Sequence, residues 1–218
     1  MLKHIVSILC QFLIWTLQFH DVSAAGFCCS PSKWTANVRT LRQEFPKDDP
    51  KSVKLTWTWQ TMNYDAVNQR VAIVTFSEND APVFERQVLD YAKGEQYVIE
   101  GETHKTCVRH PLTKSFKKAC VPEGTTGVYF AGIASMSENT VYFTQPDVTG
   151  YVTVTLADCA FVQAVTYGSG GDAVISQNVQ YMNQTLSVDP SAFKVPDNCR
   201  DSQDELVPEQ WQKYSIIG

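Results

Sequence analysis

The chain has 218 residues, a formal net charge of −5, 44% hydrophobic residues and 19% charged residues. A chain of this length forms one domain or two small ones, which excludes a large multidomain enzyme. The hydrophobic fraction is enough to bury a core, so intrinsic disorder is excluded as a description of the whole chain. The acidic balance provides no broad cationic surface, so we expect no nucleic-acid partner.

Residues 1–24 have the pattern of a signal peptide. Lys3 and His4 precede an apolar run from Ile5 to Leu17, and small residues surround Ala24. A helix of about 13 apolar residues is roughly 20 Å long, which is too short for the ~30 Å hydrocarbon core of a bilayer. We therefore expect cleavage after Ala24, a single β domain over residues 25–218, secretion, and no transmembrane segment.

Cysteine and histidine usage indicates an oxidising compartment and little capacity for catalysis. Cys10 lies in the leader, and the other cysteines are Cys28, Cys29, Cys107, Cys120, Cys159 and Cys199. An even number in a secreted chain predicts three disulfides, although six cysteines allow 15 connectivities. A metal cluster is the competing interpretation, but the sequence contains no C-x-x-C. Outside the leader only His104 and His110 remain, which leaves little histidine for catalysis or a zinc site.

The segments that follow are typical of β-structure. In residues 53–60, Val53, Leu55, Trp57 and Trp59 alternate with polar residues, which predicts a half-buried strand with these four side chains on one face. Residues 69–76 are rich in β-branched side chains, and the turn-forming residues between the two runs predict a hairpin. Further short β-prone runs lie near 84–91, 95–100, 104–109, 127–133, 139–145, 149–156, 160–167 and 172–182.

About ten short strands without an amphipathic helix between them predict an all-β fold, either a twisted antiparallel sandwich or an open barrel. Polar residues dominate Arg39–Lys54, and we expect an exposed loop there that leads into the first long strand. Only Asp201–Tyr214 has a helical pattern, so a short C-terminal helix is expected. No internal repeat or long linker divides the chain.

Chemical motifs give little support for an enzyme. Residues 168–173 fit the dinucleotide pattern G-x-G-x-x-A, but the residues after them prefer a strand to the helix that this pattern requires, so a hairpin turn is expected. The sequence contains no G-x-S-x-G, H-E-x-x-H, Walker A or EF-hand pattern. We expect no enzymatic activity and no organic cofactor. A hydrolase with convergent residues is the enzyme alternative, and its Ser-His or Cys-His chemistry would have to use His104 or His110.

Two acidic groups and one sequon are the other candidate sites. Asp201, Asp204 and Glu205 form one group, and Glu78, Asn79 and Asp80 form the other. Their oxygens could hold calcium, but turn chemistry or a helix start explains both groups, so calcium has no assigned ligands. The sequon Asn183-Gln184-Thr185 predicts glycosylation of Asn183 in a secreted chain.

Motifs spread over nearly the whole chain resemble a known family. They are Cys28-x-x-Pro31-x-x-Trp34, Tyr64-Asp65-x-x-Asn68-Gln69-Arg70-Val71, Asp158-Cys159 with Val162-Gln163, and Asp189-Pro190-Ser191-x-Phe193 with Pro196 and Cys199. In this combination and order the motifs resemble the ependymin-related proteins, and the Tyr-Asp-x-x-Asn-Gln-Arg-Val motif is the strongest of them.

The resemblance implies two stacked antiparallel sheets that form an open sandwich or half-barrel around a deep hydrophobic pocket, similar to bacterial lipoprotein carriers. It implies a secreted or lysosomal glycoprotein that is not an enzyme and that forms a homodimer. It also implies binding of a lipid or other hydrophobic ligand, calcium ion binding and cell–matrix adhesion. The disulfide pairs that it implies are Cys28–Cys159 and Cys107–Cys199, with Cys29–Cys120 as the third pair.

The expected pocket between the sheets needs large apolar walls. Its candidate wall residues are Val53, Leu55, Trp57, Trp59, Ile73, Phe130, Phe143, Val154 and Phe161. An aromatic stripe on a strand is more often solid core, and this alternative stays open. The first function hypothesis is a secreted carrier or sensor for a hydrophobic ligand. The alternative is an extracellular matrix or adhesion protein with a calcium-holding acidic surface and no functional pocket.

Overall fold

The computed structural model describes residues 28–49, 51–78, 81–101, 106–121, 128–133 and 136–202. The expected signal peptide lies outside these described residues, and so does the chain from residue 203 onward. Nearly all of the described secondary structure is β-strand. The elements are β1 (Lys33–Pro46), β2 (Lys54–Asp65), β3 (Arg70–Glu78), β4 (Ala81–Asp90), β5 (Glu95–Glu100), β6 (Thr106–Pro111), β7 (Val128–Ile133), β8 (Met136–Thr144), β9 (Val148–Thr155), β10 (Phe161–Gly170), β11 (Ala173–Thr185), the 3-10 helix η1 (Pro190–Phe193) and β12 (Arg200–Asp201).

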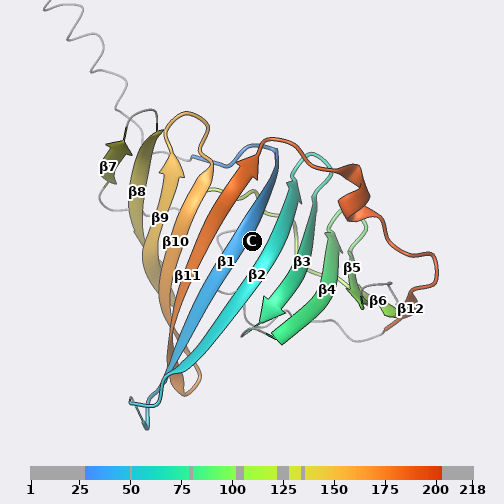
Figure 1. Cartoon of the computed structure of the whole chain (residues 1–218), viewed down its shortest axis with the longest axis horizontal. Helices are drawn as coiled ribbons and strands as arrows, with labels where there is room; N and C mark the ends of the chain where they lie inside the picture. Colours follow the sequence, from blue (N-terminus) through green and yellow to red (C-terminus); the bar gives the residue numbers. More distant parts are fainter. Residues whose placement is uncertain are drawn as a thin grey trace, which may run out of the picture.

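The strands of the described residues form one sheet in the order β12-β6-β5-β4-β3-β2-β1-β11-β10-β9-β8-β7, which can be followed across Figure 1. Only the short β12 pairs with its neighbour in parallel; the other pairings in this sheet are antiparallel. The all-β antiparallel prediction is therefore confirmed. The expected division into two stacked sheets is not confirmed, because the described strands follow one another in a single hydrogen-bonded ladder.

β1 corrects the expectation of a loop over Arg39–Lys54. It continues to Pro46, and it pairs with β11 on one side and with β2 on the other over almost its whole length. The connection to β2 is confined to the residues between Pro46 and Lys54. Sheet hydrogen bonds join backbone groups whatever the side chain is, so two long neighbours hold this polar sequence in a strand.

The end of the described chain also differs from the sequence prediction. The expected helix over Asp201–Tyr214 falls almost entirely outside the described residues, and Asp201 itself lies in β12. The 3-10 helix η1 was not predicted from the sequence. Its start is stabilised by Asp189, whose carboxylate accepts a hydrogen bond of 2.8 Å from the backbone N–H of Ser191, and by Pro190 at the first helical position.

The main hydrophobic core lies on the side of the sheet that carries Trp34, Ala36 and Val38 of β1, which we call the core face. Trp34 stacks on Tyr64 with ring centroids 5.3 Å apart. The segment after β6 covers this face, and the Tyr64 hydroxyl accepts a hydrogen bond of 3.0 Å from the backbone N–H of Ala119. The Cys28–Cys159 and Cys29–Cys120 disulfides fasten the covering segments to the sheet and to each other.

A second, smaller core covers the opposite side of the sheet over β3–β6. Phe193 of η1 packs there with Ala72, Val88 and Ile99, and the Cys107–Cys199 disulfide joins this segment to β6. Figure 1 shows η1 and the chain that follows it in front of this part of the sheet. The three disulfides are the pairs that the resemblance implies. Within the described residues, no helix has the length and apolar character that crossing a bilayer requires.

The Tyr64–Val71 motif forms the turn between β2 and β3. The Asp65 side chain is 0% exposed and accepts hydrogen bonds from the Asn68 backbone N–H (3.2 Å), the Asn68 Nδ2 (2.6 Å) and the Arg70 Nη2 (3.0 Å). Burial raises the pKa of the Asp65 carboxyl, but the hydrogen bonds from Asn68 and Arg70 outweigh this effect, so its pKa lies below the ordinary value. The motif therefore stabilises the turn between β2 and β3.

Candidate functional site

The residues predicted to form a pocket wall lie on both sides of the sheet. Ile73 on β3 is paired with Met62 on β2, and directly paired residues point to the same side. Trp57 and Trp59 are separated from Met62 by odd numbers of residues along an unbroken stretch of β2, so they point to the other side. The candidates therefore do not line one common wall.

Four of the predicted wall residues belong to the interior. Ile73, Phe143, Val154 and Phe161 are each at most 3% exposed. Phe161 packs against Tyr181 with ring centroids 5.8 Å apart, and Tyr181 meets Trp34 edge-on. These contacts are those of a packed core. The side chain of Phe130 lies outside the described residues.

Leu55, Trp57 and Trp59 of β2 belong to an apolar surface on the side opposite the core face. We call it the aromatic face and define it by Leu41, Leu55, Trp57, Trp59, Tyr142, Tyr151, Tyr167 and Val174. The strand register assembles it: one continuous cross-strand row runs through Tyr142, Tyr151, Val165, Asn178, Leu41 and Trp57. Residues from β8, β9, β10, β11, β1 and β2 thus meet on one surface.

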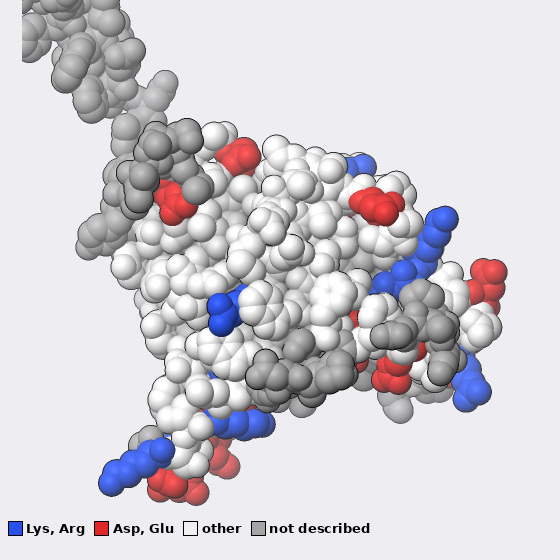
Figure 2. All heavy atoms as spheres, in the orientation of Figure 1, with Lys and Arg blue, Asp and Glu red and all other residues white. Residues whose placement is uncertain are grey.

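Large side chains of the aromatic face are open to solvent. The exposed fractions are 47% for Leu55, 41% for Trp59 and 46% for both Tyr167 and Val174, and Val53 just before β2 is 40% exposed. Figure 2 shows that the charged side chains on this side of the molecule gather mainly around the periphery. Because soluble monomers rarely expose large contiguous apolar patches, this surface is the candidate binding site.

One cation stands within the aromatic face. The guanidinium carbon of Arg39 lies 4.4 Å from the centroid of the Trp57 ring and 4.9 Å from that of Trp59. Arg39 is directly paired with Trp59 across β1 and β2, which brings the three side chains together. Its Nε is buried without a hydrogen-bond partner among the described residues. Cation–π contacts of this kind hold a guanidinium in place while its remaining N–H groups can still donate.

The sequence predicts Trp57 and Trp59 as site residues but does not predict Arg39. The alternation in residues 53–60 was a sufficient signal for Trp57 and Trp59, and β2 confirms that they share a side of the strand. Arg39 stands at the start of a polar stretch with the composition of a loop, so nothing in the sequence connects it with the two tryptophans. Its position depends on the pairing of β1 with β2, which spans about 20 residues of chain.

The aromatic face can bind an apolar molecule by removing surface from water. At about 25 cal/mol per Å², a ligand that covers about 300 Å² of it gains roughly 7 kcal/mol before its ordering cost is subtracted. Flat aromatic rings on a sheet contact acyl chains or ring systems without requiring polar partners. The Arg39 guanidinium then suits the polar end of an amphipathic molecule.

The remaining sequence-predicted sites are spread over the chain. Asn183 is exposed near the end of β11 with a positive φ of 51°, and Thr185 of its sequon is exposed as well. His110 is half-buried in β6, and His104 lies outside the described residues. Of the two acidic groups, only Asp201 has a described side chain. Over the described part of the chain, no group of three or more acidic, histidine or cysteine side chains has the arrangement of a metal site.

Comparison with known proteins gives one family. The Ependymin family profile matches residues 79–199. A search of curated protein sequences found no match. A crystal structure of an uncharacterized conserved protein from Thermus thermophilus is similar over 80% of this chain and 91% of that chain, with 10% identity and a TM-score of 0.47. A structure of PNGF-II in the P21 space group is similar over 79% of this chain and 32% of that chain, with 12% identity and a TM-score of 0.32. By its family match, this chain belongs to the ependymin family.

Proposed function

We propose that the protein is a secreted glycoprotein, stabilised by three disulfides, that binds a hydrophobic ligand, a lipid, on its aromatic face. The observation that carries this proposal is the exposure of Leu55 (47%) and Trp59 (41%) on one side of β2, beside Trp57 and Arg39. An exposed tryptophan within an apolar patch lowers solubility, and such patches commonly mark binding sites.

The enclosed pocket that the resemblance implies is part of this proposal. The aromatic face supplies one apolar wall, and a second wall would have to come from residues outside the described ranges, from a second copy of the chain or from the ligand's own membrane. The proposed homodimer is one such arrangement. The proposal assigns binding and no catalytic step to these residues.

The extracellular setting of the protein is proposed on chemical grounds. Three disulfides suit an oxidising compartment, and the exposed Asn183 is accessible to glycosylation. Calcium binding, matrix adhesion and a lysosomal destination rest on family membership alone. No ligands are assigned to calcium, and the proposed binding of a lipid to the aromatic face is argued from apolar side chains and Arg39.

The test is to identify what the secreted protein carries. The full chain is purified from a eukaryotic secretion host under non-denaturing conditions, and bound lipids are extracted and measured by mass spectrometry. We expect stoichiometric lipid on the wild type and at least a tenfold loss in a Trp57→Ala, Trp59→Ala double variant. Val67→Ala removes a 65%-exposed apolar side chain in the β2–β3 turn and serves as the matched control.

The outcomes separate the proposal from its alternative. Absence of lipid on the wild type, together with calcium-dependent binding to matrix proteins, would support the adhesion hypothesis instead. Lipid that stays bound to the double variant would place the site elsewhere. Glycosidase treatment of the same preparations tests Asn183: wild type should shift in mobility, and Asn183→Gln should not.

A further inference from the structure

A polar cavity of about 610 Å³ lies on the core face of β4, β5 and β6, away from the aromatic face. The strand register shows on which side of the sheet the cavity lies. Its lining residue Gln87 pairs with Ile73 of β3, which points to the core face, and Glu85 pairs with Thr75 on the same side. The cavity has the size of a small-molecule site.

The strand register arranges the cavity lining in cross-strand rows. One row consists of Glu85, Glu100 and Thr106, and the next consists of Gln87, Val98, Val108 and Arg200. The two valines form an apolar floor in the middle. Acidic groups therefore lie at one end of the floor, and the cationic Arg200 lies on the β12 side of it.

The acidic end consists of two carboxylates that face each other across neighbouring strands. Glu85 is directly paired with Glu100, and like charges in this position repel. One oxygen of each is held: Glu85 Oε1 accepts a hydrogen bond of 2.5 Å from Gln87 Nε2, and Glu100 Oε2 accepts one of 3.3 Å from Thr106 Oγ1. Among the described residues neither carboxylate has an ion-pair partner.

The neighbouring amides show which kind of cation this end suits. Gln96 Nε2 donates to Gln87 Oε1 at 3.4 Å, so Gln87 directs its N–H group, and not its carbonyl oxygen, toward Glu85. A metal ion prefers carbonyl oxygens and is repelled by an N–H donor. Gln96 is 1% exposed and lies two cross-strand rows away from the Glu85–Glu100 pair, opposite Leu89, so it acts on the acidic end only by orienting Gln87. The acidic end therefore offers carboxylate oxygens as acceptors and suits a ligand with several N–H donors.

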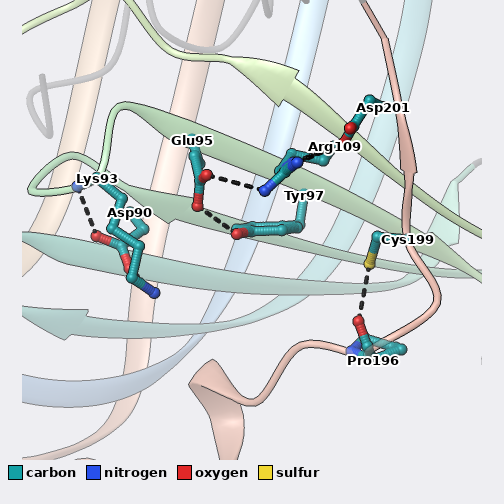
Figure 3. Close-up of polar contacts among 8 residues, drawn as sticks. All are labelled: Asp90, Lys93, Glu95, Tyr97, Arg109, Pro196, Cys199 and Asp201. Atoms are coloured by element: carbon teal, nitrogen blue, oxygen red, sulfur yellow. Dashed lines mark hydrogen bonds and ion pairs between the residues drawn. The ribbon is translucent and has the colours of Figure 1, made fainter.

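The cationic end is held in place by the anchoring of β12. Figure 3 shows Arg109 of β6 between Glu95 and Asp201, and it donates to them at 3.1 Å and 2.6 Å. Tyr97 donates a further hydrogen bond to Glu95. Together with the Cys107–Cys199 disulfide, these contacts fix Arg200 beside Val108. The Cα atoms of Glu100 and Arg200 are separated by two strand spacings and one two-residue step, about 12 Å, a span that a small ligand and two long side chains can fill.

We propose that this cavity binds a small zwitterion with a primary ammonium group and a phosphate group. The ammonium group lies between Glu85 and Glu100, where it donates to both carboxylates and removes their repulsion. The phosphate group lies at Arg200, whose planar guanidinium can bind it through two hydrogen bonds. This chemistry is that of ethanolamine phosphate, either free or as the head group of a lipid.

The test uses the full, disulfide-bonded chain and isothermal titration with ethanolamine phosphate. We expect saturable binding to the wild type, at least a tenfold weaker affinity in Glu100→Gln and in Arg200→Gln, and no change in Asp147→Asn, which removes an exposed charge between β8 and β9. The free Glu100→Gln protein should melt at a higher temperature than the wild type, because one of two repelling charges is gone. A higher melting temperature paired with a lower affinity for the ligand is not expected of a variant that merely misfolds.

Further arms identify the source of the ligand and the result that overturns the proposal. Vesicles with phosphatidylethanolamine, compared with vesicles of phosphatidylcholine alone, test the lipid head group, and binding to the free compound only assigns the soluble source. No binding of ethanolamine phosphate in either form, or equal affinity in wild type and Glu100→Gln, refutes the proposal. Calcium binding that is lost in Glu100→Gln, together with no binding of ethanolamine phosphate, also refutes it. The Trp57→Ala, Trp59→Ala variant should bind ethanolamine phosphate normally, which keeps this test separate from that of the aromatic face.

Discussion

Replacement of Asp65 by Asn should lower the free energy of unfolding far more than an acid-to-amide change at an exposed position. Asp65 is 0% exposed and pairs with Arg70 at 3.0 Å while Asn68 donates to the same carboxylate. The amide removes the charge of the ion pair with Arg70, and its NH2 group replaces an oxygen that accepts from Asn68 or Arg70, so that two donors face each other. Breaking a buried pair from one side costs about 3–5 kcal/mol. With a slope of about 4 kcal/mol per molar guanidinium chloride, this loss lowers the unfolding midpoint by about 1 M.

The assay is equilibrium unfolding in guanidinium chloride at neutral and acidic pH, with disulfides intact. The folded-state pKa of Asp65 lies below the ordinary value of 3.8, so its stabilising contribution is present above that value and is lost as the pH falls through the folded pKa. Wild type and Asp65→Asn should therefore converge in strong acid. Asp172→Asn, an exposed turn residue, is the control. A loss below about 1 kcal/mol at neutral pH, as for a surface ion pair, would refute the reasoning.

Three other predictions concern the framework of the fold. Trp34→Ala empties a site that is 0% exposed and should lower the free energy of unfolding by about 3–5 kcal/mol in the same assay. Replacing Cys29 and Cys120 by Ser removes a bridge over a sequence separation of 91 and should cost about 4–5 kcal/mol. Burial raises the pKa of Tyr91 to about 12, and burial with the hydrogen bond to Glu95 raises that of Tyr97 to about 12. Their stabilising contribution is complete below the ordinary value of 10.0 and is lost as the pH rises through about 12, so ultraviolet titration should show late ionisation together with alkaline unfolding. Ionisation of Tyr91 and Tyr97 at the ordinary value of 10.0 in the folded protein would contradict this prediction.

The sequence predicted local β-structure well because alternation is a local signal. The pattern of Leu55, Trp57 and Trp59 predicted both a strand and a shared side, and β2 has both. The pattern could not show what covers that side. Cover comes from distant segments, such as the chain around Ala119 on the core face and η1 on the opposite face over β3–β6, and these contacts span dozens of residues.

Polar strands were the main source of error. Arg39–Pro46 has the composition of a loop but lies in the middle of the sheet between β2 and β11. The same limit hid the polar cavity: Glu85 and Glu100 appear as ordinary solvated strand residues until the β4–β5 register places them opposite each other. A side-chain pattern predicts which residues of one strand share a side. A site assembled from several strands also depends on the register in which those strands pair.

Quenching of tryptophan fluorescence by lipids with brominated acyl chains tests the central claim, because bromine quenches only at contact. Trp211 lies outside the described residues, so it is first replaced by Phe to remove its emission. In this Trp211→Phe protein, we expect brominated lipid to quench the emission of Trp57 and Trp59, which lie on the aromatic face. Trp34 is 0% exposed and serves as an internal reference. Adding Trp57→Phe and Trp59→Phe should leave Trp34 emission that brominated lipid does not quench. Absence of quenching with both tryptophans present, or equal quenching after their removal, would contradict hydrophobic-ligand binding on this face.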